Sequence, residues 1–518
     1  MTFKSFISLA ILFTLIVCMA GQLLIDSNIT NTSSTLIIAI TTISTIAYLY
    51  WGDAYSKTPI SATVVLSLLF TGLFGALFFQ TIYWNPVTKY LYNPINTFFK
   101  LAFYQLLGIG SHYAYLLFQK DKYKAGVANT FSLKRVLSKI GLYDVPSVYT
   151  VWIISIVGIF AYILAKLLSG TLGNILLNLK FLIWFPFFIL FYIYKFGRDY
   201  ASPPRQYSLI LIFFIAVAII GIMFNTRAII ITGIVNLFLI TIISLLNKNP
   251  RYRIGVYGLF SIIALSIISL LKPLSDFSDA MLAARAEREN ITGIEMMINT
   301  FDLYSKLDNA NLLHNDKFIE NKVYTSYDEI YIENGILNRF VLTKFHDNAF
   351  HFSSKVTNNG KQEVITHIND SLIAILPQPL LELLGIELNK EHLQKTTTDI
   401  LVHEASGRRL GGYKVPSTFA EIELVFGSLA PIVFLCMTFV FFSIIDLFSV
   451  TNKSNGLFIS LPFFGMASVY IFFQIPIYSL IGVITLLVRS FVQDVLIFCL
   501  LMYALSYIFK PFRKNTRV

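Results

Sequence analysis

The sequence predicts an all-α polytopic membrane protein, with about 12 transmembrane helices and one large extracytoplasmic loop between helices 9 and 10. Composition gives the first reason: 56% of the 518 residues are hydrophobic, only 13% are charged, and the mean hydropathy is +0.68. A globule in water cannot bury so much apolar surface, so lipid must surround most of the chain. The second reason is that the apolar residues gather in long runs, interrupted by a single long polar stretch.

The apolar runs are long enough to cross about 30 Å of hydrocarbon as helices. Eleven of them are 5–25, 34–51, 60–82, 148–168, 174–195, 207–224, 228–246, 254–271, 422–446, 457–475 and 490–509. A twelfth, 96–118, contains Lys100, Gln105 and His112, so it could either span the membrane or lie along its surface. The first run is longer than the core of a signal peptide and no clear cleavage site follows it, so we expect a retained helix.

Basic clusters decide the predicted topology, because short loops rich in Lys and Arg stay in the cytoplasm. All of them fall on one side only if the 96–118 run crosses the membrane. Both termini are then cytoplasmic, and residues 273–420 face the outside. The clusters are Lys120 to Lys124, Lys134 to Lys139, Lys195 to Arg205, Lys248 to Arg253 and Lys510 to Arg517.

This topology divides the chain into three parts: 1–272 with helices 1 to 9, the loop 273–420, and 421–518 with the last three helices and a basic tail. The loop carries 20 acidic and 14 basic residues, net −6, whereas the rest carries 26 basic and 9 acidic, net +17. The basic excess therefore reflects membrane topology, and no nucleic-acid partner is expected. All three cysteines lie in apolar runs, which leaves the loop without a disulfide or a cysteine metal site.

Four cations lie at the predicted outer ends of helices, where they could meet an anionic lipid headgroup. Arg227 supplies the only charge in the tight turn between two very apolar helices, and Lys180 lies inside an apolar run. Both are candidates for substrate binding. Lys166 and Lys272 are more simply explained as side chains that reach the interface and anchor a helix end.

The loop offers further candidates. Four polar or cationic residues could bind a diphosphate and stabilise charge on a leaving group. They are Asn338, Arg339, Arg408 and Arg409. A neutral histidine could act as a general base, although each one taken alone is better explained as structural or exposed. None has metal-ligand spacing, so no metal is expected. The loop histidines are His314, His346, His351, His367, His392 and His403.

Two acidic residues lie where the chain enters the next helix. Ser417 or Thr418 with Glu421 has the spacing of a capping box, which gives Glu421 a structural explanation. Glu423 lies deeper in the apolar run, where capping does not account for it. Both carboxylates are candidate catalytic residues, and so are the cations Arg227 and Arg339.

Three passages resemble the O-antigen polymerase (Wzy-type) and oligosaccharide repeat-unit polymerase families of bacterial polysaccharide assembly. Asn225-Thr226-Arg227 is similar to the Ser/Asn-x-Arg hairpin of these proteins. Leu337 to Phe340, followed by Ile375 to Leu380, is similar to a loop segment with a Pro-rich stretch. Pro416 to Gly427 resembles the "S…E…FG" entry into the helix after the loop. The chain departs from the pattern at Gln378, where Arg or Lys is frequent.

The resemblance implies a membrane-embedded glycosyltransferase of the bacterial inner membrane that needs no cofactor. It would join polyprenyl-diphosphate-linked oligosaccharides into a surface polysaccharide, together with a flippase and a chain-length regulator. In the resulting hypothesis Arg227 and Arg339 hold the donor diphosphate, helped by Lys180 and Arg408 or Arg409. Glu421, Glu423 or a loop histidine activates the acceptor hydroxyl.

Three other functions are alternatives, although the cations at outer helix ends argue against the transporter. An O-antigen ligase has similar topology and the same donor, but transfers finished glycan to a lipid acceptor. A flippase or other transporter without chemistry would place charges in the middle of helices and would need no long outer loop. A scaffold would use the loop to bind a partner.

Overall fold

The computed structural model describes residues 3–124, 133–168, 170–247, 272–284, 292–307, 327–376, 378–388, 393, 395–408, 410, 414–452 and 456–511. It is 81% helical, and its described residues include one two-stranded antiparallel sheet.

Nine helical stretches of the described residues are long and apolar enough to cross a membrane, so the chain is an all-α polytopic membrane protein. They are Phe3–Ile25 (α1), Ile29–Trp51 (α2), Pro59–Ile82 (α4 to α5), Val148–Leu167 (α8), Leu172–Asp199 (α9 to η4), Pro203–Met223 (α11), Arg227–Leu246 (in α12, Arg227–Asn247), Thr418–Phe448 (α20 to η9) and Ser479–Ser506 (α24 to α25).

Several of these stretches are built from shorter helical pieces. The pieces are α4 (Pro59–Leu69), η1 (Phe70–Phe74) and α5 (Gly75–Ile82); α9 (Gly170–Leu177), η3 (Asn178–Trp184), α10 (Phe185–Phe196) and η4 (Gly197–Asp199); α20 (Thr418–Phe426), η8 (Gly427–Leu429), α21 (Ala430–Ile445) and η9 (Asp446–Phe448); α24 (Ser479–Thr485), η11 (Leu486–Ser490) and α25 (Phe491–Ser506). The pieces η1 and η11 are π-helical turns, a local widening that often lies near functional sites.

The three remaining predicted windows have different outcomes. The window 96–118 lies within the 31-residue helix α6 (Pro94–Lys124), and the window 254–271 lies outside the described residues. The prediction of one helix through 457–475 is wrong at its start. Residues 456–459 form a strand there, and Pro462, which is favoured in the first turn of a helix, lies at the start of the following helix.

The hairpin and the helical pieces around it have these bounds: β1 (Ser449–Asn452), β2 (Gly456–Ile459), α22 (Leu461–Ser468), η10 (Val469–Phe473) and α23 (Gln474–Ile477). The helical part of this region spans only Leu461–Ile477, which is shorter than the nine long stretches.

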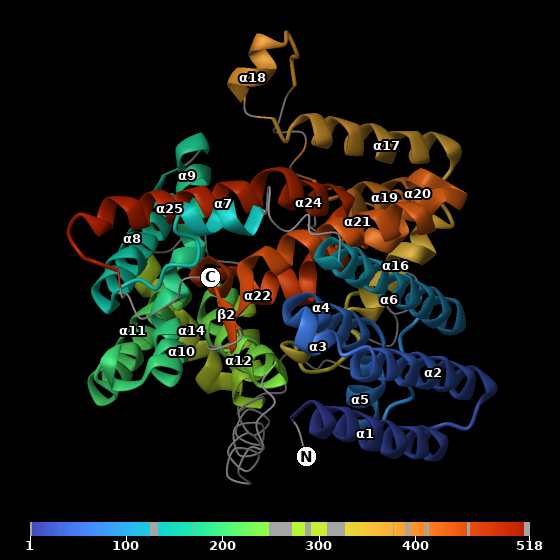
Figure 1. The fold of residues 1–518 in the computed structure, drawn as a ribbon. Coiled ribbons are helices and arrows are strands. Elements are labelled where there is room, and N and C mark those ends of the chain that lie inside the picture. Colours follow the sequence, from blue (N-terminus) through green and yellow to red (C-terminus); the bar gives the residue numbers. More distant parts are fainter. Residues whose placement is uncertain are drawn as a thin grey trace.

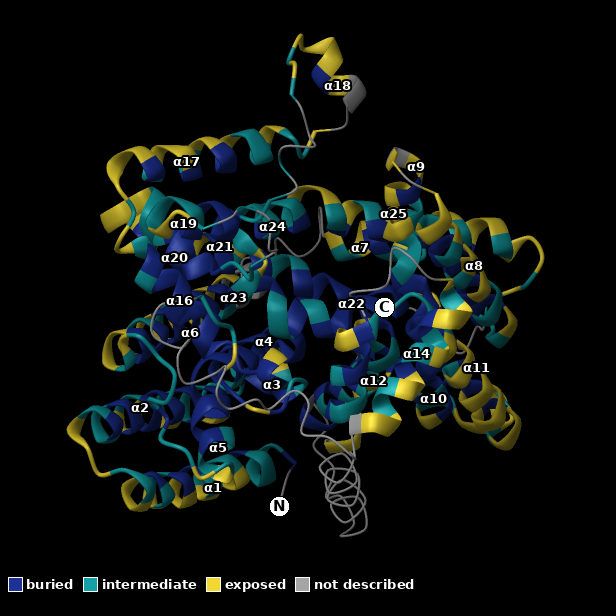
Figure 2. Cartoon of the chain, turned by 180° about the vertical axis from the view of Figure 1, so that it is seen from behind, coloured by how far each residue is buried: buried dark blue, intermediate teal, exposed yellow. Residues whose placement is uncertain are grey.

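The helices form two groups joined by the C-terminal part of the chain (Figure 1). Helices α1, α2, α4 and α6 pack together in one group, and α8, α10, α11 and α12 with η3 form the other. Helix α21 packs on α6, while α22 packs on α10 and α12, so the last hundred or so residues bridge the two groups. Figure 2 shows the buried residues concentrated in α4, α16, α20 and α22, and the exposed ones along α17 and the outer face of α1.

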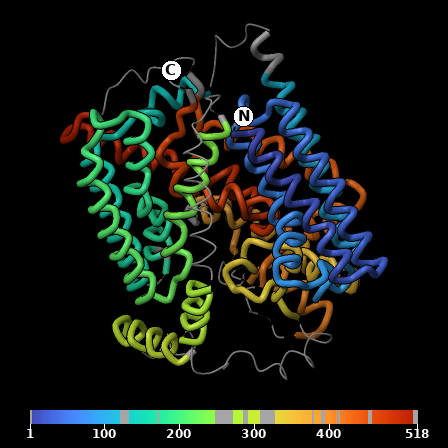
Figure 3. The backbone as a smooth tube through the Cα atoms, turned by 90° about the horizontal axis from the view of Figure 1, so that it is seen from below, coloured from blue at the N-terminus to red at the C-terminus, as the bar shows by residue number. Residues whose placement is uncertain are grey.

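The described parts of residues 272–420 lie at one end of the molecule, and the start of α1 lies at the opposite end (Figure 3). Residues 272–284 are helical. The other pieces are α14 (Gly293–Leu307), η6 (Leu337–Arg339), α16 (Thr343–Ser353), α17 (Asn358–Ile373), α18 (Gln378–Leu383) and α19 (Thr397–Ser406). Two short helices complete the described elements, α3 (Ala54–Lys57) and α7 (Leu133–Lys139).

Asp347 fixes this region to the helix bundle. Its buried carboxylate accepts hydrogen bonds from the backbone N–H groups of Tyr92 (2.7 Å) and Asn93 (3.1 Å) and from the Thr97 hydroxyl (2.9 Å). These groups surround the start of α6, where N–H groups lack partners within the helix. The Lys344 ammonium lies 3.7 Å from the same carboxylate and donates to the carbonyl of Tyr90. Asp347 therefore anchors α16 to the first turn of α6.

A similar anchor joins α21 to α4. The buried carboxylate of Asp446 accepts from the backbone N–H of Ser61 (3.1 Å) and from its hydroxyl (2.6 Å), in the first turn of α4. The same hydroxyl lies 2.8 Å from His112 Nε2, and His112 Nδ1 lies 2.6 Å from the Tyr48 hydroxyl. One polar cluster thus connects α2, α4, α6 and the end of α21.

We expect Asp347→Ala to lower the free energy of unfolding by about 3 kcal/mol, because it leaves the buried Lys344 without its counter-ion and the N–H groups at the start of α6 without their acceptor. Asp302→Ala is the matched control, since it removes a carboxylate that is 50% exposed and pairs with Lys306 on the surface. Chemical unfolding in detergent measures both. Equal losses in the two variants would contradict the anchoring role.

Candidate functional site

An open groove of about 580 Å³ lies where α24 passes α17 and α19 (Figure 1). Its volume is within the range typical of ligand pockets. One wall comes from the loop region and the other from the helical stretch that follows α23. The residues that line it include His367, Ile375, Lys395, Thr397, Lys414, Val415, Ile477, Ser479, Ile481 and Arg489.

The groove combines cationic side chains with a mostly apolar surface. Lys395 and Lys414 contribute from the loop wall and Arg489 from the opposite wall. Lys414 is held in place by Asp399 at 3.2 Å, and Arg489 donates to the carbonyl of Ile375 at 3.5 Å. A ligand with an anionic headgroup and an apolar tail matches this surface, since lysine and arginine are the usual partners of phosphate.

His367 lines the same groove on α17. Burial lowers its pKa below the ordinary 6.5, and a hydrogen bond to the backbone of Lys395 opposes that change. Its imidazole is therefore neutral at pH 7, and the positive charge of the groove comes from Lys395, Lys414 and Arg489. A neutral imidazole in this position can accept a proton.

Glu421 lies behind the groove and joins its two walls. The residue is 5% exposed. Its carboxylate accepts a hydrogen bond from the Thr397 hydroxyl and a second from the backbone N–H of Leu480 at 2.8 Å. Thr397 and the neighbours of Leu480, Ser479 and Ile481, all line the groove. The carboxylate thus sets the distance between the walls without lining the groove itself.

The predicted capping box at Glu421 is wrong. Ser417 is the residue that caps α20, and its hydroxyl accepts from the backbone N–H of Ala420 at 3.4 Å. The third helical position is therefore Ala420, which has no carboxylate to return the bond. Glu421 lies one position further along and points to Thr397 and Leu480 instead.

Glu423 belongs to a separate cluster. Its carboxylate pairs with Lys100 and accepts from the Tyr104 hydroxyl at 3.2 Å. The Lys100 ammonium also lies 4.5 Å from the ring of Phe350. The side chains of Glu423 and Lys100 are 30% and 29% exposed, respectively. The structure therefore assigns Glu423 a counter-ion on α6.

Lys180 and the turn at Arg227 come together around Tyr162. The Lys180 ammonium lies 5.9 Å from the Tyr162 ring, and the Tyr162 hydroxyl donates to Thr226 at 2.9 Å. Arg227 donates to the hydroxyl of Ser278 at 2.7 Å. Neither Lys180 nor Arg227 is among the residues that line the groove.

The loop cations have different surroundings. Arg339 is 54% exposed and lies 3.4 Å from Glu329, which also accepts from the backbone N–H of Val415 at the edge of the groove. The carbonyl oxygen of Arg408 lies 2.5 Å from His403 Nδ1. Arg409 lies outside the described residues.

Asn338 has a structural role in the turn before α16. Its side-chain oxygen accepts from the backbone N–H groups of Tyr331 (2.9 Å) and Ile332 (3.0 Å), and its amide donates to the carbonyl of Glu329 (3.0 Å). These three hydrogen bonds fix the backbone that carries Glu329 and Arg339.

The remaining loop histidines that the structure describes are held by neighbours. His346 is fully buried, which lowers its pKa to about 3, and its Nδ1 lies 2.8 Å from the Ser417 hydroxyl. His351 stacks on Tyr92 with ring centroids 4.0 Å apart. His314 and His392 lie outside the described residues. Among the residues described, no group of three or more His, Cys, Asp or Glu could hold a metal ion.

Sequence reasoning did not select Lys395, Lys414 or Arg489. For the two lysines no local signal was present, because they are brought to the groove by the folding of the loop. For Arg489 a local signal was present, because it is the only charged residue between Ile477 and Phe491 in an apolar stretch.

No family model, no curated protein and no solved structure matches this chain.

We expect Glu421→Ala to lower the free energy of unfolding by about 2 kcal/mol more than Glu421→Gln. The alanine leaves the Leu480 N–H and the Thr397 hydroxyl buried without an acceptor, whereas glutamine retains one carbonyl oxygen. Chemical unfolding of the purified variants in detergent measures the difference. If Gln proved as damaging as Ala, the negative charge and not the pair of hydrogen bonds would be what the site requires.

Proposed function

We propose that this chain is a membrane-embedded glycosyltransferase that joins polyprenyl-diphosphate-linked oligosaccharide repeat units into a surface polysaccharide. The observation that carries the proposal is the groove, where three cations and a neutral histidine border a mostly apolar surface. A lipid-linked sugar diphosphate has the matching parts: an anionic diphosphate, a polar glycan and an apolar tail. The resemblance of Asn225 to Arg227, Leu337 to Phe340 and Pro416 to Gly427 to repeat-unit polymerases supports the same conclusion.

In this proposal Lys395 and Arg489 hold the donor diphosphate, and Lys414 is positioned beside them by Asp399. The acceptor hydroxyl attacks the anomeric carbon of the donor, the bond from that carbon to the diphosphate oxygen breaks, and the lipid diphosphate leaves with the electron pair. The cations stabilise the charge that develops on the leaving group. His367 receives the proton of the acceptor hydroxyl.

The proposed location is the bacterial inner membrane, with both termini in the cytoplasm and residues 273–420 in the periplasm. Basic clusters support this orientation. The groove is then on the periplasmic side, where a flippase would deliver the lipid-linked units and a chain-length regulator would act.

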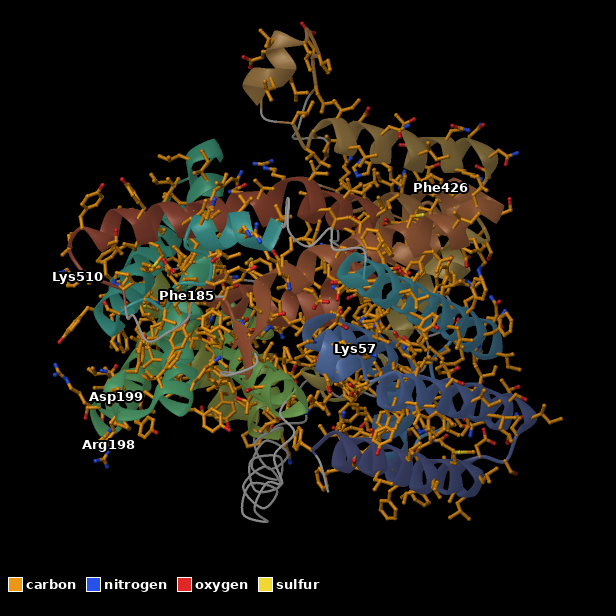
Figure 4. All side chains as sticks on the ribbon, in the orientation of Figure 1. Lys57, Phe185, Arg198, Asp199, Phe426 and Lys510 are labelled. Atoms are coloured by element: carbon orange, nitrogen blue, oxygen red, sulfur yellow. The ribbon has the colours of Figure 1, made fainter. Side chains whose placement is uncertain are left out.

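The test is a deletion of the gene in its host, complemented with variants, followed by gel analysis of the surface polysaccharide. Deletion should remove the ladder and leave single repeat units on the acceptor. Lys395→Gln with Arg489→Gln should lower polymer by on the order of 10²-fold, because two diphosphate contacts are lost. Arg198→Gln is the control, since this exposed cation lies at the far edge of the molecule (Figure 4).

Three results would contradict the proposal. Lipid-linked polymer that never reaches its acceptor would indicate a ligase. An unchanged polysaccharide after the deletion would exclude a role in polymerisation and favour a transporter or a scaffold. Unchanged polymer in the groove double variant, inserted at normal levels, would exclude the groove as the site of the reaction.

The role of His367 predicts the pH dependence of polymer formation in isolated membranes. Because its pKa lies below 6.5, the base is deprotonated at pH 7, and the rate should fall only as the pH drops through that lowered value. Asp370 and Lys395 are the charged groups that act on the ring, and Lys414, Tyr478 and Arg489 line the same groove. His367→Asn should give a much lower rate without this acid limb. A wild-type limb that persists in the variant would assign the proton to another group.

A further inference from the structure

A second cationic site lies on the group of helices that contains α8, around the ring of Tyr162. The ammonium groups of Lys166 and Lys180 lie 5.7 Å and 5.9 Å from the centroid of this ring. The Tyr162 hydroxyl donates to Thr226, next to Arg227. Three elements thus converge: the last turn of α8, the 3₁₀ segment η3, and the turn that opens α12.

Lys180 is the clearest sign that this site takes an anion. Its partly buried ammonium lies between two aromatic rings, 5.9 Å from Tyr162 and 5.8 Å from Trp184, and it forms no ion pair with any residue that the structure describes. The rings attract the cation, but they do not replace a hydrogen-bond acceptor for its three N–H groups. A second cation, Lys166, is close enough to repel it. An anion bound here would relieve both costs.

The turn before α12 is held by hydrogen bonds to the 272–284 helix and places Arg227 at the positive end of a helix. Asn225 has a left-handed backbone with φ of 48°, and its side chain donates to the carbonyl of Met281 at 2.7 Å. Arg227 donates to Ser278 in the same 272–284 helix. The 21-residue helix α12 starts at Arg227, and the N-terminus of a helix carries a partial positive charge that favours anions.

The surface beside these cations is apolar and exposed. Large side chains at the end of α8 and on α9 are 45% to 70% exposed; they are Leu164, Leu167, Leu172 and Ile175. In a membrane protein such a surface faces lipid chains. A phosphate at the cations would therefore be attached to an apolar chain that runs along these residues.

We propose that Lys166, Lys180 and Arg227 bind the phosphate headgroup of an anionic lipid. This site is separate from the groove, because none of its three cations lines the groove. Figure 1 shows α8 and α9 on the opposite side of the molecule from α17 and α19. If both proposals hold, the chain has two separate places for lipid-borne phosphate, the groove and the site around Tyr162.

The test is native mass spectrometry of the full-length protein in detergent, titrated with dioleoyl phosphatidic acid. We expect the Lys166→Gln/Lys180→Gln double variant to bind the most tightly held phosphatidic acid molecule about tenfold more weakly than wild type does. The reason is that each basic residue adds to the affinity for an anionic headgroup. Lys180→Arg keeps the charge and should retain binding. The matched control is Arg198→Gln/Lys510→Gln, which removes two exposed cations at the edge of the molecule (Figure 4).

The groove double variant, Lys395→Gln/Arg489→Gln, should leave this lipid in place, so the result is independent of the proposed enzymatic function. Undiminished binding by Lys166→Gln/Lys180→Gln would overturn the site, as would an equal loss in the control.

Phosphatidylcholine and inorganic phosphate are the remaining probes. Equal binding of phosphatidylcholine would overturn the role of the anionic headgroup, and displacement of the lipid by millimolar phosphate would overturn the role of its chain. A melting temperature within a degree or two of wild type shows that the double variant is folded.

Discussion

The buried carboxylate of Asp347 is the contact on which the candidate groove depends. It joins α16 to the first turn of α6, and α16 in turn packs on α19 and α20. The residue before it, His346, reaches the Ser417 hydroxyl that caps α20. On α20, Glu421 then connects the two walls of the groove. A displacement of α16 would therefore reach the groove through a continuous series of buried polar contacts.

Polar contacts have this role because apolar contacts alone specify position poorly in a membrane protein. Lipid chains are as apolar as leucine, so contacts between helices are selected by close packing and by hydrogen bonds. Asp347 and Asp446 both use the unsatisfied N–H groups at the start of a helix, on α6 and α4 respectively. Each carboxylate has several donors in fixed directions, so it determines which helix lies against which and at what height.

The membrane architecture could be predicted from sequence because it follows from run length and composition. The start of the 457–475 run could not, since Gly456 to Ile459 is as apolar as a helix and forms a strand only through its pairing with β1. At Glu421 the local spacing suggested a capping box, but the partners that decide its direction, Thr397 and Leu480, lie 24 and 59 residues away. The sequence predicted Lys180 and Arg227 as helix-end cations. Their connection through Tyr162 could not be predicted, because it depends on how α8 packs against η3 and the turn before α12.

The surroundings of these cations separate them from ordinary anchoring residues. A lysine that only reaches the interface places its stem along apolar surface and its ammonium in water. Lys180 instead holds its ammonium between two rings, and the side chain of Lys414 is 13% exposed and fixed by Asp399. Holding a cation away from water costs free energy that a snorkelling lysine avoids. At Lys414 the Asp399 carboxylate already offsets this cost. At Lys180 an anionic ligand with its own apolar chain would offset it, without entering the polar clusters that hold the helices together.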